Sequence, residues 1–330
     1  MSESIVSIRN LGTHYPITGG WFGPTPVVRA LDNIDMEIKR GQFFGLVGES
    51  GSGKTTLGRA ILKAAPISAG KIIFYDGEKE LDINTLAKQD MLTFRRQAQL
   101  IFQDPYAALS PRMTVRDIIA EPLEVMKLTD SKDETNQRVR EIASECRLNV
   151  EHLRRFPHAF SGGQRQRISI ARALVANPSF MVADESVAAL DVSIQADILN
   201  LLKSLQQQRG LTFLFISHDL SVVAHVCDVV AVMYLGRLVE MAPTRKLFAK
   251  QRHPYTAALL SAIPSLDLDH HHKAIKLEGE IPSPISPPSG CRFHTRCAYA
   301  QDRCKMEIPQ WRKLDHDHSV ACHFADELEL

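Results

Sequence analysis

The sequence predicts an α/β fold built on a parallel sheet, followed by a smaller cysteine-containing extension. Short apolar stretches at 43–48, 179–184 and 211–217 have the composition of strands buried on both faces of such a sheet. A helical pattern at 193–208 separates the last two, and a glycine-rich loop joins the first stretch to another helix. This strand–loop–helix unit is typical of α/β proteins.

The charge and hydropathy patterns exclude several classes of protein. Lys and Arg number 39 and Asp and Glu 38, so a net charge of +1 predicts no nucleic-acid partner. The apolar runs are far shorter than the ~20 residues that cross a bilayer. The N-terminal segment lacks the pattern of a secretory signal. We therefore expect a cytoplasmic protein whose six cysteines are free thiols or ligands.

The remaining elements follow in order along the chain. Alternating apolar residues at 4–11 and 28–38 predict a hairpin-like opening with a turn-rich insert at 19–26. A charged, helical pattern broken by prolines runs from about 90 to 157, and apolar residues at 229–241 return to the sheet. After residue 250 come a short helix at 253–266, a polar stretch and a proline-rich extended segment at 280–290. The predicted units are 1–250, with a helical subdomain at about 90–160, and 251–330.

The most specific motif is a phosphate-binding loop. The pattern G-x-x-x-x-G-K-[ST] lies between a predicted strand and a predicted helix, as the motif requires. Its residues, with the next threonine, are Gly48, Glu49, Ser50, Gly51, Ser52, Gly53, Lys54, Thr55 and Thr56. Backbone N–H groups of such a loop face phosphates. We expect Lys54 to reach the β- and γ-phosphates and the Thr55 hydroxyl to bind Mg²⁺.

Two acidic residues end the buried stretch at 179–184. Asp184 and Glu185 could form an ordinary solvated turn, but next to a phosphate loop they predict a catalytic site. Asp184 is expected to bind Mg²⁺ directly or through its outer shell. Glu185 is expected to polarise the attacking water as a base.

A second glycine-rich segment stands before the helical pattern RQRISIARALVA. It consists of Ser161, Gly162, Gly163 and Gln164. Ser161 is a candidate N-cap, and a cap alone would explain such a segment. A helix N-terminus with free N–H groups is also an anion site, which is the alternative interpretation.

Together these motifs resemble the ATP-binding subunits of ABC transporters over nearly the whole chain. The order GESGSGKTT, Gln103 in LIFQDPYAALSPRMTV, SGGQRQR, MVADE, Ala189-Leu190-Asp191 and His218 in FISHD matches that family. The resemblance implies a P-loop NTPase (RecA-like) core with a β-subdomain and a helical subdomain, and ATP with Mg²⁺ as cofactors. It also implies that the Ser161–Gln164 segment contacts the γ-phosphate of ATP held by the loop of a second subunit.

The resemblance assigns roles to further residues. Tyr15 corresponds to the aromatic that stacks on adenine, Gln103 to a Mg²⁺ ligand that senses the membrane subunits, and His218 to a catalytic γ-phosphate contact. Asp191 belongs to a loop that crosses the dimer interface. The ordinary alternatives are a surface strand aromatic for Tyr15, a loop amide for Gln103 and a satisfied histidine at a strand end for His218. Ser186 departs from the family, which usually has proline there, so the loop that carries the base is expected to be less rigid.

The extension resembles the oligopeptide and dipeptide importer branch. Members of that branch can hold a [4Fe-4S] cluster on four cysteines, which here are Cys291, Cys297, Cys304 and Cys322. Zinc and unligated thiols are the alternatives, although no C-x-x-C pair is present. Cys146 and Cys227 lie in apolar contexts and are expected to be packing residues. The run His270-His271-His272 is expected to be a solvated linker.

The resemblance also implies partners. These are two transmembrane permease subunits, a second ATP-binding subunit that is identical or related, and an extracytoplasmic substrate-binding protein. The chain would be peripheral on the cytoplasmic face of the inner membrane. Nickel, glutathione or oligosaccharides are alternative cargoes. A soluble ABC ATPase without transport function and a P-loop kinase are alternative classes, but the single cassette and the SGGQRQR segment disfavour them.

Overall fold

A computed structural model describes residues 3–17, 26–263 and 275–330 of the chain. The turn-rich insert lies almost wholly outside the described residues, and so does the run His270-His271-His272. The described residues form two sheets. The smaller, antiparallel sheet has the strand order β2 (Val27–Lys39), β1 (Ser4–Pro16), β4 (Ala69–Asp76), β5 (Lys79–Asp82). The pairing of β1 with β2 confirms the predicted hairpin.

The larger sheet carries the α/β core. Its order is β11 (Arg312–Lys313), β12 (Ser319–Val320), β10 (Arg237–Pro243), β9 (Val229–Tyr234), β3 (Phe43–Val47), β8 (Thr212–Ile216), β7 (Phe180–Asp184), β6 (Ala98–Ile101). The five strands from β9 to β6 run parallel, while β10, β12 and β11 pair antiparallel. The carboxyl ends of β3 and β7 therefore meet at one edge, which is where ligands bind in such sheets.

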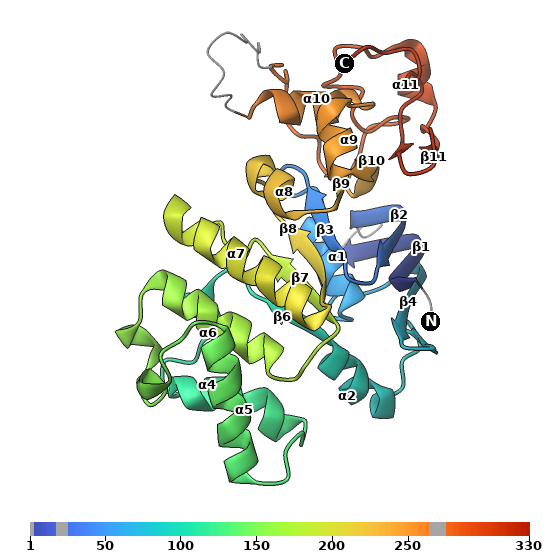
Figure 1. Cartoon of the computed structure of the whole chain (residues 1–330). Coiled ribbons are helices and arrows are strands. Elements are labelled where there is room, and N and C mark those ends of the chain that lie inside the picture. The colour runs from blue at the N-terminus through green and yellow to red at the C-terminus, as the bar shows by residue number, and fades with distance from the viewer. Residues whose placement is uncertain (1–2, 18–25, 264–274) are drawn as a thin grey trace.

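The helices divide into layers around this sheet (Figure 1). They are α1 (Lys54–Ile61), α2 (Lys88–Gln97), α3 (Pro105–Ala108), α4 (Val115–Val125), α5 (Lys132–Glu145), α6 (Gly162–Leu174), α7 (Val192–Arg209), α8 (Leu220–Val226), α9 (Thr244–Ala249), α10 (Pro254–Ser261) and α11 (Asp302–Met306), with short 3₁₀ turns at Val150–His152 and Pro157–Ala159. Helices α4 to α6 gather at the end of the molecule opposite the C-terminal extension. No helix in the described ranges has the length and apolarity to cross a membrane.

Alternation along the parallel strands separates two apolar cores. In β8, Phe213 and Phe215 belong to one core, whereas Leu214 and Ile216 belong to the other. All four side chains are fully buried. The stretch is continuously apolar because both faces of the sheet are covered. This confirms the prediction that it is a strand buried on both faces.

One strand lies within a segment that was predicted to be helical. The segment from 90 onward was expected to be helical, but β6 pairs parallel with β7 between α2 and α3. Its sequence, AQLI, is only four residues long and follows a charged helix. An edge strand with one neighbour needs little apolar sequence, so the helical pattern around it dominated.

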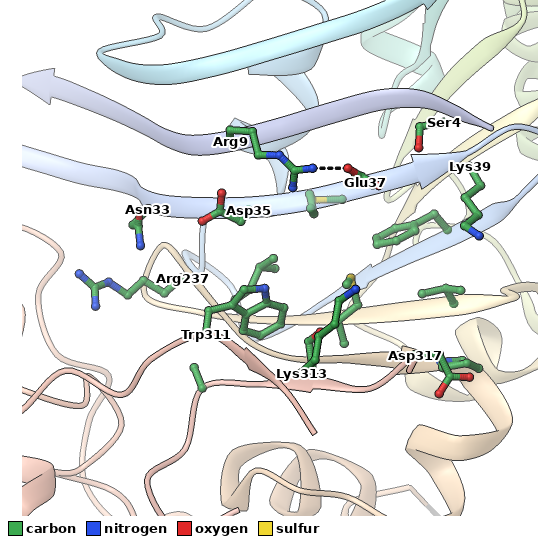
Figure 2. Close-up of a pocket in the computed structure, with 18 of the residues that line it drawn as sticks. Ser4, Arg9, Asn33, Asp35, Glu37, Lys39, Arg237, Trp311, Lys313 and Asp317 are labelled. Atoms are coloured by element: carbon green, nitrogen blue, oxygen red, sulfur yellow. Dashed lines mark hydrogen bonds and ion pairs between the residues drawn. The ribbon is translucent and has the colours of Figure 1, made fainter. Parts of the chain in front are cut away.

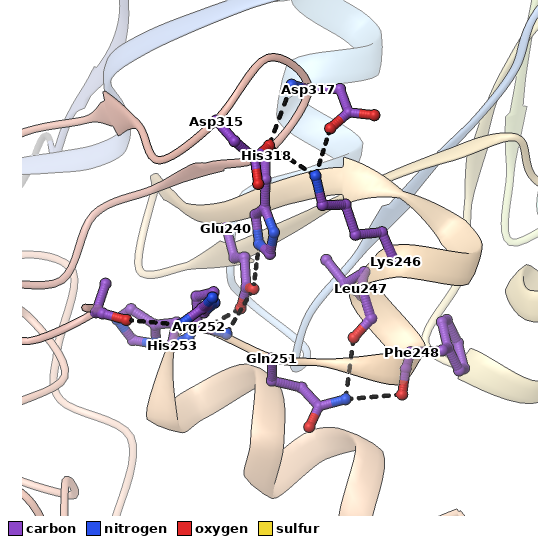
Figure 3. Close-up of polar contacts among 11 residues, drawn as sticks. Glu240, Lys246, Leu247, Phe248, Gln251, Arg252, His253, Asp315, Asp317 and His318 are labelled. Carbon is purple, nitrogen blue, oxygen red and sulfur yellow. Dashed lines mark hydrogen bonds and ion pairs between the residues drawn. The ribbon is translucent and has the colours of Figure 1, made fainter. Parts of the chain in front are cut away.

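The extension is attached to the core through a buried carboxylate of β10 (Figure 3). Glu240 is fully buried and accepts hydrogen bonds from the backbone N–H groups of Arg252 and His253, at 2.7 and 3.0 Å. His318 Nε2 lies 2.7 Å from the same carboxylate. Beside these contacts β12 pairs with β10, so residues on both sides of position 250 share one sheet.

Candidate nucleotide-binding site

The phosphate loop surrounds a pocket of about 280 Å³ at the carboxyl edge of the parallel sheet. Among the residues that line it are Ser50, Gly51, Gly53, Lys54, Thr55, Thr56, Gln103 and Glu185. Two glycines are sterically required. A Cβ at Gly48 would lie 2.2 Å from the Met233 carbonyl oxygen, and one at Gly53 would lie 2.5 Å from that of Ala30. Both also have positive φ, which L side chains rarely adopt.

Lys54 is folded back into the loop. Its side chain donates to the carbonyl oxygens of Gly48 and Glu49, at 2.7 and 2.9 Å. Burial lowers the pKa of Lys54, and the charges of Glu185 and Asp184 oppose that shift. An ammonium that has already lost part of its water and has carboxylates nearby can bind a phosphate at little further desolvation cost.

Thr55 and Asp184 form the next layer of the site. The Thr55 hydroxyl donates to Asp184 Oδ1 at 3.0 Å. Asp184 ends β7 and is buried; burial raises its pKa, and the neighbouring Glu185 charge raises it further. A hydroxyl and a carboxylate are the hard oxygen donors that Mg²⁺ prefers, and a divalent cation would compensate the buried acid. The two side chains therefore fit the predicted metal.

Glu185 is held from several sides. Its carboxylate accepts a hydrogen bond from Gln103 Nε2 at 2.9 Å and lies 3.5 Å from His218 Nδ1. Its N–H donates to the carbonyl oxygen of Ile216, and its φ is +45°. A non-glycine residue in the left-handed region is conformationally costly and is kept only where its surroundings fix it. The structure thus brings the three residues predicted as catalytic together.

The second glycine-rich segment lies elsewhere. Neither Ser161–Gln164 nor Asp191 lines the pocket. Ser161 caps α6 in a reciprocal capping box with Gln164, which confirms the predicted N-cap. A Cβ at Gly163 would lie 2.5 Å from the Ile194 side chain, so this glycine lets α6 approach the first turn of α7, just after Asp191.

Tyr15 is likewise outside the pocket lining, but it pairs with Val28 across the β1–β2 hairpin. Val28 and Arg29 do line the pocket, and so does Pro284 from the extension. The Arg29 N–H lies 3.3 Å from the Pro284 carbonyl oxygen and donates to it. Pro284 was not predicted, because its proline-rich segment matches no nucleotide motif.

The four cysteines of the extension converge on a cavity of about 10 Å³. Burial is the main cause that raises the thiol pKa values of Cys291, Cys297 and Cys322 to about 11. No cluster of three or more His, Cys, Asp or Glu side chains within the described residues has an arrangement that could hold a metal ion. All six cysteines are free, and Cys146 and Cys227 are buried among apolar residues as predicted.

A larger cleft of about 1220 Å³ lies between β2 and the extension (Figure 2). Trp311 projects into it, and its charged residues carry both signs. Arg9 pairs with Glu37 on its wall. Because none of the phosphate-loop residues reaches this cleft, it is separate from the nucleotide pocket.

The parallel sheet, the loop and the acids at the end of β7 define a P-loop nucleotide-hydrolysing protein. Family models agree: residues 31–188 match the ABC transporter model, and 239–304 match the oligopeptide/dipeptide transporter C-terminal region. A putative peptide import ATP-binding protein of Brucella ovis is 50% identical over 98% of both chains. The di/tripeptide transport ATP-binding protein DppF of Pseudomonas aeruginosa is 44% identical over 98% of this chain and 99% of its own.

A solved structure gives the same fold. The ATP-binding cassette MJ0796, a dimer in a post-hydrolysis state bound to ADP and Pi, has a TM-score of 0.63 and 28% identity over 73% of this chain and 99% of its own. This chain belongs to the ABC transporter family of ATP hydrolases, in the branch that carries the oligopeptide/dipeptide transporter C-terminal region.

Proposed function

We propose that this chain is the ATP-hydrolysing subunit of an importer for oligopeptides or dipeptides. The names of its relatives, peptide import and di/tripeptide transport proteins, support this cargo. The observation that carries the ATPase mechanism is the placement of the Glu185 carboxylate between Gln103 and His218, at the pocket that holds the phosphate loop.

The mechanism assigns tasks to the side chains at this pocket. Lys54 moves from the loop carbonyls to the β- and γ-phosphates of ATP when these enter the pocket. Glu185 accepts a proton from the attacking water, and Gln103 and His218 orient its carboxylate. Thr55, Asp184 and Gln103 would hold Mg²⁺, which would supply charge neutralisation for the phosphates. The buried Asp184 is then compensated rather than left as an isolated charge.

The second glycine-rich segment serves a second ATP-binding subunit. Ser161, Gly162, Gly163 and Gln164 start α6 outside the pocket of their own chain, with N–H groups at a helix N-terminus. A head-to-tail dimer would place them on the γ-phosphate of a nucleotide held by the other chain, with Asp191 at the interface and Tyr15 on the adenine. That the MJ0796 cassette is a dimer supports the dimer itself.

Glu185→Gln tests the mechanism. We expect ATP still to bind, hydrolysis to fall by about 10²–10⁴-fold, as for loss of a general base, and an ATP-bound dimer to accumulate. The matched control is Glu151→Gln, an exposed glutamate of a 3₁₀ turn. Phosphate release and size-exclusion chromatography with ATP are the measurements. Wild-type turnover in Glu185→Gln would remove Glu185 from this role, and a monomer with every candidate partner chain present would refute the dimer.

The partners follow from the importer role. We propose that two permease subunits, a second ATP-binding subunit and an extracytoplasmic binding protein complete the transporter, with this chain on the cytoplasmic face of the inner membrane. Fractionation of cells with and without the permease genes tests this. The chain should sediment with membranes only when the permeases are present. Membrane binding that is independent of the permeases would contradict the proposal, as would a chain that stays soluble in their presence.

We also propose that Cys291, Cys297, Cys304 and Cys322 hold a [4Fe-4S] cluster in the second unit, 251–330, which follows the ATPase unit, 1–250. The convergence of four thiols supports it, and thiolates are the usual ligands of such clusters. The four thiols do not have a metal-holding arrangement in the described structure, so they must rearrange, the cavity must widen and the thiols must ionise for this to occur. Anaerobic purification should give iron and sulfide that are lost in Cys304→Ser but kept in the control Cys227→Ser. Zinc, or no metal, in the wild type would overturn it.

A further inference from the structure

The phosphate loop is bound from outside by the C-terminal extension. The Glu49 carboxylate accepts two hydrogen bonds from the Arg296 guanidinium, at 2.7 and 3.1 Å. The Glu49 N–H donates to the Tyr255 hydroxyl at 2.9 Å. Both the side chain and the backbone of the second loop residue are therefore fixed by residues more than 200 positions further along the chain.

These contacts are largely shielded from water. The Arg296 side chain is 7% exposed, the Glu49 side chain is 25% exposed, and Tyr255 is fully buried. Tyr234 and Phe293 pack around Tyr255, and the Arg296 guanidinium lies 5.9 Å from the centre of the Tyr234 ring. A bidentate arginine–carboxylate pair in such surroundings has a defined geometry and is little screened by salt.

The ion pair between Arg296 and Glu49 also determines the net charge of the phosphate loop. Glu49 is an acid within a loop that must receive polyphosphate, and its carbonyl oxygen is one of the two that hold Lys54. Its charge acts on Lys54 in the same direction as the charges of Asp184 and Glu185. An uncompensated carboxylate here would repel phosphates, since like charges in a poorly solvated site disfavour each other. Arg296 supplies the compensating charge.

We propose that Arg296 and Tyr255 are positioning residues of the nucleotide site, and that the extension thereby determines ATP affinity. Arg296 neutralises Glu49, while Tyr255 fixes the loop backbone around Lys54. The inference rests on the proposed phosphate site. It extends that site to a part of the chain outside the cassette motifs.

Four proteins test the charge argument: wild type, Arg296→Met, Glu49→Gln and the double variant. The readout is the Kd for ADP with Mg²⁺ by calorimetry, because ADP avoids ATP-driven dimerisation and turnover. We expect about tenfold weaker binding in Arg296→Met, within the range of couplings inside one polar network. Glu49→Gln should bind at least as tightly as wild type. The double variant should recover to within about threefold of wild type, since the repelling charge is gone.

Arg303→Met is the matched control. Arg303 also precedes a cysteine of the extension, but it pairs with the exposed Glu307 of its own segment at 2.8 Å. It should bind ADP like the wild type. If Arg303→Met weakened binding as much as Arg296→Met, the effect would come from the cysteine region and the proposal would be wrong.

Lys54→Ala distinguishes a failure of the phosphate site from a failure of the role of Arg296. Lys54→Ala should lose ADP binding; if it does not, the phosphate site itself is wrong. If Lys54→Ala loses binding but Arg296→Met does not weaken it, only the role of Arg296 is refuted. A double variant as weak as Arg296→Met would indicate lost packing rather than charge repulsion, and would also overturn the proposal. Tyr255→Phe should raise the Kd by less than Arg296→Met, because it removes one neutral acceptor.

Discussion

His253 predicts a pH dependence of stability that can be isolated. The residue precedes α10 and is 1% exposed. Its Nδ1 accepts the Tyr255 N–H at 3.1 Å, so the neutral imidazole acts as the N-cap. Burial lowers its pKa from 6.5 to about 3. A proton on Nδ1 would remove the cap and place a charge in an apolar site.

The direction and size of the change in unfolding free energy follow from the linkage between proton binding and folding. A histidine whose pKa is lower in the folded state contributes full stability above its unfolded pKa and loses it as the pH falls toward the folded pKa. Between pH 7.5 and pH 5 the unfolded chain gains most of one proton at His253, and the folded chain gains almost none. With pKa values of 6.5 and about 3, this difference corresponds to about 2 kcal/mol of lost unfolding free energy.

His253→Asn isolates the contribution of His253 to the pH dependence of stability, because asparagine can cap a helix but does not titrate. Trp311 lies in the extension and reports its unfolding by fluorescence when Trp21→Phe removes the other tryptophan. Urea denaturation at the two pH values should show that the wild type loses about 2 kcal/mol more than His253→Asn. All other ionisable side chains are common to both proteins. Equal pH dependence in the two proteins would refute a neutral, buried His253.

Three further results follow from single contacts. Gly163→Ala should destabilise the fold by about 1–3 kcal/mol in urea denaturation, because the new Cβ would lie 2.5 Å from the Ile194 side chain. Gly162→Ala is the control, since its Cβ would lie 3.7 Å from Leu190, and equal losses in the two variants would contradict the steric argument. Nucleotide affinity, measured with Mg²⁺ at decreasing pH, should begin to weaken at a higher pH than an aspartate of ordinary pKa would cause, because the raised pKa of Asp184 lets its carboxylate take up a proton at higher pH. A pH-independent affinity would count against Asp184 as a Mg²⁺ ligand. Ser186→Ala should leave the unfolding free energy within about 1 kcal/mol of wild type, because the Ser186 hydroxyl is buried and has no hydrogen-bond partner in the described part of the chain; a larger loss would reveal a partner.

The phosphate loop could be predicted because its chemistry is contiguous in the sequence. Gly48 to Thr55 form one turn between a strand and a helix, so spacing alone reports the geometry. Glu185 was predicted for a similar reason, as the residue directly after a buried strand. The family resemblance assigned roles to Gln103 and His218, but their contacts with Glu185 were not predicted, because these residues come from different strand ends that only the sheet brings together.

The contacts of the extension could not be predicted in this way. Glu49 and Arg296 are 247 positions apart, and nothing in RFHTRC distinguishes Arg296 from the neighbouring Arg292. The two arginines nevertheless have different partners, because Arg292 pairs with Asp32. Which acid each arginine meets is decided by how the extension packs on β9 and β10, and local patterns do not carry that information.

The composition of the chain changes near residue 250, but the packing does not divide there. Beyond it, β12 covers the edge of β10, His318 and two backbone N–H groups satisfy the buried Glu240, and Arg296 satisfies Glu49. Removing the extension would expose an unpaired strand edge and leave two carboxylates without their partners, one of them in the phosphate loop. The nucleotide site and the extension thus depend on the same contacts, so a perturbation of the extension should be detectable first as a change in nucleotide affinity.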